Sequence, residues 1–335
     1  MKQNANRYRI NLPSLPASWN DIPVPQLEEI LRLMAKRHTE GIIRGEEAAD
    51  RLYRLRVFLC LLGIRIAGRT VTDESGETVF IFRRKGIRHI FERIPMRAWQ
   101  VNQWIDSRLK FLDRPTALLK SPYPFVTLRR GRLKLKGPAN MMGDVTFQQY
   151  LVAQNTLNSY WNQLKHIEEA IHNKSGRKTL KQLTKRATEL RCSFLATMFC
   201  PSAMETGRIQ DGRYIRTPER IIWSFSTSQT DDNAHHFRKV QERMFPVMEL
   251  FFQSVQEAYS RLYPDLYTPS GKGKKVTNPI VQEVGMVNSI MKEQGFTSPE
   301  AVYSCEAVRI LEIMDSMCKK AKEIDRMNQR MNLKK

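Results

Sequence analysis

Apolar residues recur every three or four positions along most of the chain, a spacing that predicts amphipathic helices. The runs predict helices at about 25–41, 45–62, 96–112, 146–172, 179–199, 231–262, 279–294 and 299–332. Thr146 followed by Gln149 predicts a capped start for the fourth of these. Pro246 lies inside the sixth, so we expect a kink or a break there.

Two stretches of the first half have β-strand character. Residues 68–94 contain the apolar runs 78–82 and 87–91 around turn-forming residues, and residues 125–137 contain two short alternating runs around Arg130, Gly131 and Arg132. Each predicts a small hairpin or meander. The segment 220–226 fits either a strand or a buried loop. The fold class that follows is α+β and mainly α-helical, with a mixed N-terminal half carrying two hairpins and a helical C-terminal half.

Composition shifts divide the chain into four parts. We expect a basic mixed α/β region at 1–140, a helical domain at 141–266, a linker-like loop at 267–279 and C-terminal helices at 280–335. Trp19, in the Pro-rich lead before the first helix, is expected to fold back over the first two helices in a core role.

The bulk properties favour a reduced, cytoplasmic protein. The longest apolar run, 57–64, is far shorter than the roughly 20 residues that cross a bilayer, and the first residues lack a secretory pattern. We therefore expect no membrane partner. The 5 cysteines are odd in number and scattered, which favours buried free thiols over a disulfide framework.

A net charge of +21 is the strongest global feature of the sequence. Residues 1–140 hold 27 Lys and Arg against 13 Asp and Glu, so the excess is concentrated in the first half. The two hairpins carry much of it and are candidates for binding nucleic acid or another polyanion. The candidate residues are Arg83, Arg84, Lys85, Arg88, Arg129, Arg130, Arg132, Lys134 and Lys136. The alternative is an ordinary solvated hairpin face.

Other motifs do not support catalysis. The run 270–275 (SGKGKK) lacks the spacing of a phosphate-binding loop and is expected to be a linker. Asp231 and His235 have metal-ligand spacing, but an aspartate at a helix start serves as a cap, which is the favoured interpretation. We expect no enzyme activity, no cofactor and no metal.

The last predicted helix has a heptad seam of about three heptads. Its members are Ile310, Met314, Met317, Ala321, Ile324, Asn328 and Met331. Met314, Met317 and Ile324 are candidates for binding an apolar face of a partner protein. Packing against the chain's own body is the alternative, and the oligomeric state stays open.

Three segments together resemble a poorly characterised family of proteins encoded in the tail-gene regions of prophages from gut anaerobes. They are LPASWNDIPVPQLEEILRL (15–33), YPFVTLRRGRLKLKGPANMMGDVTFQQY (123–150) and RCSFLATMFCP (191–201). SWND departs slightly from the SWNEL typical of that family. The resemblance implies a phage structural or tail-assembly role, chaperone-like, in the host cytoplasm or in the virion, with phage tail or other assembly proteins as partners. It assigns no catalytic residue.

The sequence thus predicts a non-enzymatic phage-derived structural or tail-assembly protein that acts through protein contacts. The alternative is a basic accessory protein that binds nucleic acid through its hairpins. The first interaction should survive salt, whereas the second should weaken steeply with it.

Overall fold

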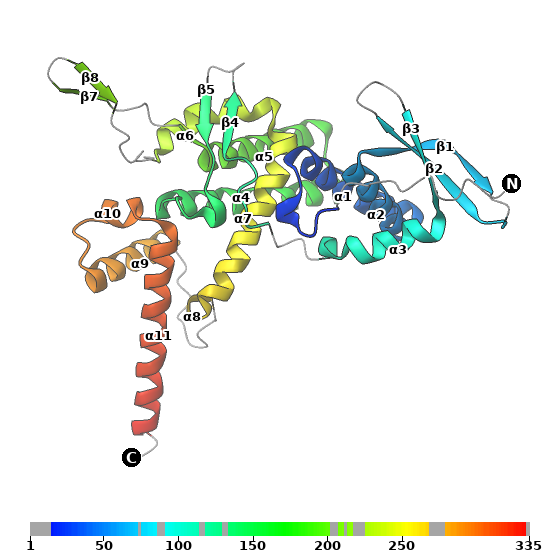
Figure 1. Cartoon of the computed structure of the whole chain (residues 1–335). Coiled ribbons are helices and arrows are strands. Elements are labelled where there is room, and N and C mark those ends of the chain that lie inside the picture. Colours follow the sequence, from blue (N-terminus) through cyan, green and yellow to red (C-terminus); the bar gives the residue numbers. More distant parts are fainter. Residues whose placement is uncertain are drawn as a thin grey trace. The chain divides into compact units, whose positions relative to one another are not determined.

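The computed structural model describes residues 15–72, 75–85, 91–113, 118–128, 133–201, 207–210, 213–216, 225–267 and 279–332. The chain forms two compact units, 1–118 and 119–335, each with its own core. Most described residues are helical and the strands are short and antiparallel (Figure 1), which confirms the mainly helical α+β class. The boundary expected near residue 140 lies inside the second unit.

A helical hairpin opens the first unit. α1 (Val24–Arg44) and α2 (Glu46–Leu62) confirm the first two predicted helices, and α2 ends at Gly63, whose φ of 63° is the left-handed conformation that glycine adopts easily. Trp19 lies in a 3-10 turn, η1 (Trp19–Asp21), and is only 1% exposed. Its Nε1–H donates to the carbonyl of Phe111 at 2.9 Å, so the predicted core role is confirmed.

A three-stranded antiparallel sheet follows in the order β1–β2–β3. The strands are β1 (Ile64–Thr72), β2 (Thr78–Lys85) and β3 (Phe91–Arg97), and they lead into α3 (Ala98–Arg108) and the 3-10 turn η2 (Lys110–Asp113). The strand predicted at 78–82 is confirmed. β1 was not predicted, and the helix expected from residue 96 begins at Ala98 because β3 continues to Arg97. Residues 87–90 of the other predicted strand lie outside the described residues.

The predicted hairpin at 125–137 is confirmed in the second unit as β4 (Phe125–Leu128) and β5 (Leu133–Lys136), with β6 (Cys200–Pro201) paired to β5. Gly137 follows β5 at a point of close approach. A Cβ there would lie 1.9 Å from the carbonyl oxygen of Tyr123, so only glycine fits. The 3-10 turn η5 (Asn140–Met142) then leads into the helices.

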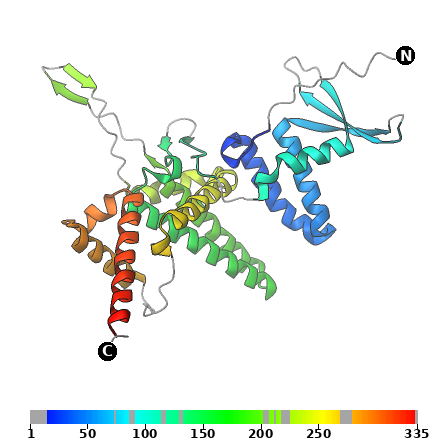
Figure 2. The same ribbon diagram turned by 60° about the horizontal axis from the view of Figure 1, so that its bottom comes forward.

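Two long helices form the centre of the second unit, α4 (Phe147–His172) and α5 (Arg177–Met198), side by side in both views (Figures 1 and 2). The hydroxyl of Thr146 accepts a hydrogen bond from the backbone N–H of Gln149 at 3.2 Å, which confirms the predicted cap. The side chain of Gln149 does not return to the cap but donates to the carbonyl of Thr197 at 2.7 Å, tying α4 to α5.

The helix predicted at 231–262 breaks, but not at Pro246. It consists of α6 (Thr227–Ala234), the 3-10 turn η6 (His235–Lys239) and α7 (Gln241–Leu262), and α7 continues through Pro246. Phe237 is fully buried in the η6 turn, with its ring 5.6 Å from that of Phe199. Tertiary packing therefore sets the corner, and the proline does not.

The C-terminal region consists of α8 (Pro264–Tyr267), α9 (Pro279–Gln294), α10 (Pro299–Ser304) and α11 (Ala307–Asn332). The single helix predicted at 299–332 is therefore wrong. The backbone N–H of Phe147 donates to the carbonyl of Cys305, and that of Ala307 donates to the carbonyl of Val145, both at 2.8 Å. In a continuous helix these backbone groups would bond to other residues of the same helix. Because they bond to residues at the start of α4 instead, the helix is interrupted between α10 and α11.

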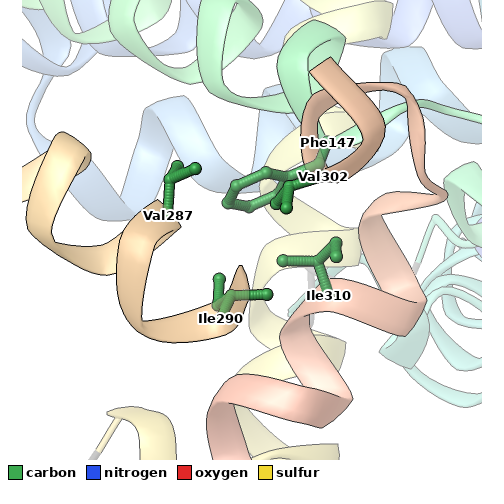
Figure 3. Packing of buried hydrophobic residues seen from close by; sticks show 5 residues of the cluster. All are labelled: Phe147, Val287, Ile290, Val302 and Ile310. Atoms are coloured by element: carbon green, nitrogen blue, oxygen red, sulfur yellow. The ribbon is translucent and has the colours of Figure 1, made fainter. Parts of the chain in front are cut away.

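A buried apolar cluster joins α4, α9, α10 and α11, and its side chains converge in Figure 3. Its members are Phe147, Val287, Ile290, Val302 and Ile310. A two-stranded hairpin, β7 (Gly207–Gln210) and β8 (Arg213–Arg216), completes the second unit. Residues 220–224 and 268–278, from the segments interpreted above as a strand or loop and as a linker, lie outside the described residues.

All 5 cysteines are free, as predicted, and two of them are buried. Helices long and apolar enough to span a bilayer are absent from the described residues.

Candidate functional site

The sheet of the first unit has one buried face and one open face. Phe82 on β2, Ile64 on β1 and Met96 on β3 are buried on one face, whereas Ile66, the partner of Phe82 on β1, is 44% exposed. Because side chains alternate along a strand, the neighbouring Arg83 belongs to the opposite face, where it is exposed.

Three arginines share one register position across the three strands. Arg65 on β1 is opposite Arg83 on β2, and Arg83 is opposite Arg93 on β3. We call these three residues the arginine row. Adjacent strands are about 4.8 Å apart, so the row spans roughly 10 Å of the sheet.

Arg65 and Arg83 place like charges directly opposite each other, which destabilises an antiparallel pair. The next register position is different: Arg84 there is opposite Glu92, a pair of opposite charge. The need to protect a sheet edge does not explain Arg83, because β2 is the central strand. The strand register therefore brings three positively charged residues to one position across the sheet.

Charges are only partly neutralised across this face. Arg65 is exposed and has no ion-pair or hydrogen-bond partner among the described residues. Further along the face Arg97 pairs with Glu77 at 3.2 Å. A guanidinium presents a planar fork of donors that fits a phosphate in bidentate fashion, so the exposed Arg65 and Arg83 are chemically suited to binding phosphates.

The cations predicted for the first hairpin differ in their positions relative to the arginine row. Arg83 belongs to the row, Arg84 and Lys85 are the last two residues of β2, and Arg88 lies outside the described residues. Arg65 and Arg93 were not among the predicted residues. Charge clustering alone could not identify them, because their significance depends on strand register.

The second predicted hairpin contributes less in its described part. Lys134 is exposed on β5, with its ammonium 4.9 Å from the centre of the Phe125 ring. Lys136 is half-buried and pairs with Asp144 at 2.5 Å, which makes it part of the local fold. Arg129, Arg130 and Arg132 lie outside the described residues. The two hairpins belong to different units.

The predicted partner-binding residues separate into two groups along α11. Met314 and Met317 are half-buried and pack against the apolar cluster of Figure 3. Ile324, two turns further on, is 56% exposed, and Met327 beside it is 58% exposed. Of the three predicted residues, Ile324 is therefore the one that is open to a partner.

A metal site is not supported by the described residues, which contain no group of three His, Cys, Asp or Glu able to hold an ion. Asp231 lies on α6 and His235 begins η6, where the centre of its ring lies 3.6 Å from that of His236, with the two rings tilted by 55°. The thiol of Cys200 is buried, and its burial raises its pKa to about 11, which keeps it protonated and unreactive at neutral pH.

Comparison of the chain with protein families, with curated proteins and with solved structures found no match.

Proposed function

We propose that this chain is a non-enzymatic binding protein that holds a nucleic-acid backbone against the open face of its β1–β3 sheet. The observation that carries the proposal is the arginine row, in which Arg65, Arg83 and Arg93 share one register position. Arg65 and Arg83 are exposed on adjacent strands about 4.8 Å apart, so both can contact phosphates of one nucleic-acid strand. The net charge of +21 supports long-range attraction of a polyanion.

The experiment is a salt titration of the full chain with a fluorescently labelled 20-base-pair duplex, read by anisotropy. Each phosphate contact contributes about 0.9 to the slope of log K against log salt. We expect Arg65→Gln and Arg83→Gln each to reduce the magnitude of that slope by about 0.9. A change in the base sequence of the duplex should have little effect on affinity, because the arginine row is expected to contact the phosphate backbone and not the bases.

Arg108→Gln is the matched control. Arg108 is an exposed arginine near the end of α3 in the same unit, and it has no partner among the described residues. Its replacement removes the same charge away from the row and should leave the slope unchanged. Equal losses in Arg65→Gln and Arg108→Gln would mean that net charge alone attracts the duplex, and the proposal would fail.

A second function is favoured by a separate observation, the exposed apolar end of α11. Ile324 and Met327 lie in solvent, whereas Ile310, Met314 and Met317, nearer the start of α11, belong to or pack against the apolar cluster. With the resemblance to prophage tail-region proteins, this supports a role in phage assembly through contact with a helical partner.

The assembly role is tested by pull-down of tail proteins co-expressed from the same prophage. Ile324→Lys should abolish the interaction at both low and high salt, while the Arg65→Gln variant should retain it. An interaction that tolerates Ile324→Lys but dissolves at high salt would contradict the assignment of this surface.

A further inference from the structure

A groove with a volume of about 790 Å³ runs along α5 in the second unit, between this helix and the corner formed by α6 and η6. Lys181, Lys185 and Arg186 line it from α5, and Arg238 lines it from η6. The arginine row is in the other unit, so an inference about this groove does not depend on that site.

The cations of the groove are incompletely neutralised. Lys181 and Arg238 have no ion-pair or hydrogen-bond partner among the described residues. Lys185 and Arg186 share the single carboxylate of Glu189, each at 3.8 Å, which is long for an ion pair in solvent. The α5 wall of the groove therefore has three cations against one carboxylate, and Arg238 adds a cation on the opposite wall.

Small side chains line the groove between these cations. The hydroxyls of Thr184 and Thr188 donate to backbone carbonyls one turn earlier, at 2.8 and 3.1 Å. These hydroxyl groups therefore have no proton left to donate to a ligand, whereas the methyl groups can make apolar contacts with it. Cys192 is buried one turn further along the helix, and burial raises its thiol pKa, so it contributes a neutral small surface. Bulky apolar side chains of a ligand can approach closely here.

The signs of the lining charges discriminate between two kinds of anionic partner. Glu189 on α5 and Asp231 on α6 both face the groove. A nucleic-acid backbone is negative at every phosphate, so it would meet repulsion on both walls. A protein helix can place carboxylates opposite the cations and apolar or basic residues opposite Glu189 and Asp231.

The length of the groove matches such a helix. The lining residues of α5 extend from Lys181 to Ser193, which is about 18 Å of helix axis, or some three turns. We propose that this groove binds an acidic amphipathic helix of a protein partner, with its apolar stripe on Thr184 and Thr188 and its carboxylates against Lys181 and Arg238.

The test is a selection from a yeast-displayed library of 18-residue amphipathic helices for binding to the labelled full chain. The library varies the positions that flank the apolar stripe of each helix. The selected helices should be enriched in Glu and Asp beside their apolar stripe. The double variant Lys181→Glu/Arg238→Glu should weaken their binding at least tenfold. Both residues are exposed, so the variant should fold normally, as circular dichroism can check.

Lys178→Glu is the control, because Lys178 is an exposed lysine of α5 that does not line the groove. It should leave helix binding within twofold of the original. Selected helices without acidic enrichment, or equal losses in the double variant and the control, would overturn the proposal. Displacement of the helices by a 20-base-pair duplex that binds the groove would assign it to nucleic acid instead. Failure of the duplex to bind the arginine row would leave this result unaffected.

Discussion

Replacement of Arg65 by glutamine should move stability and affinity in opposite directions. Arg65 and Arg83 carry like charges directly across β1 and β2, and Arg65 has no compensating partner among the described residues. Two unit charges about 6 Å apart in water repel by about 0.7 kcal/mol. The variant should therefore unfold with a free energy that is unchanged or higher by up to about 0.7 kcal/mol.

The same replacement removes one phosphate ligand. One contact contributes about 0.9 logarithmic units per decade of salt, so binding of a duplex at roughly 0.1 M salt should weaken about eightfold. Urea denaturation followed by tryptophan fluorescence measures the first effect, and anisotropy measures the second. The stability gain should vanish in about 1 M salt, where the screening length falls to roughly 3 Å.

A loss of stability with unchanged affinity would refute this reasoning, because it would make Arg65 a structural residue of the sheet. Arg108→Gln again provides the comparison, since it removes an exposed arginine that has no like charge placed opposite it by strand pairing.

Three further predictions concern the second unit. Gly137→Ala should destabilise the protein by about 3 kcal/mol in urea denaturation, because its Cβ would overlap the carbonyl oxygen of Tyr123; a loss below about 1 kcal/mol would contradict the close approach. Burial raises the pKa of Glu249, so ionisation of this carboxyl lowers stability as the pH rises through that pKa. Glu249→Gln should therefore be more stable than the original at pH 7, with the advantage disappearing below the ordinary value of 4.5; a pH-independent difference would refute the assignment. Met317→Lys should lower the unfolding free energy by about 1–3 kcal/mol, whereas Ile324→Lys should change it by less than about 0.5, and equal losses would contradict their different burial.

The helices were predictable because their apolar spacing reflects burial on one face. α1, α2, α4 and α5 follow that spacing and end at recognisable caps or breakers, such as Gly63. The strand β1 was not predictable by the same logic. Its register shifts between Ile66 and Thr70, and such an irregularity interrupts the alternation that identifies a strand.

The apolar spacing also could not predict helix interruptions that are caused by tertiary packing. The interruption at Cys305 depends on hydrogen bonds to the start of α4, more than 150 residues earlier in the chain. The corner at η6 depends on the contact between Phe237 and Phe199. Periodicity reports which face of a helix is buried, but not which distant backbone group competes for its hydrogen bonds.

The candidate site was predictable as a region and not as a set of residues. The basic run of the first hairpin pointed to β2, but charge density could not separate Arg83 from Arg84. Strand register separates them: Arg83 is opposite Arg93, whereas Arg84 is opposite Glu92. Arg65 comes from a strand that the pattern did not reveal, so the row emerged only from the fold.

The most direct test of the central claim is to map where nucleic acid touches the full chain. A 20-base-pair duplex carrying photoreactive iododeoxyuridine would be crosslinked to the protein and the attached peptides identified by mass spectrometry. We expect crosslinks concentrated in β1–β3, residues 64–97, and reduced in the Arg65→Gln variant but not in Arg108→Gln. Crosslinks concentrated elsewhere in the chain, or unchanged by Arg65→Gln, would contradict it.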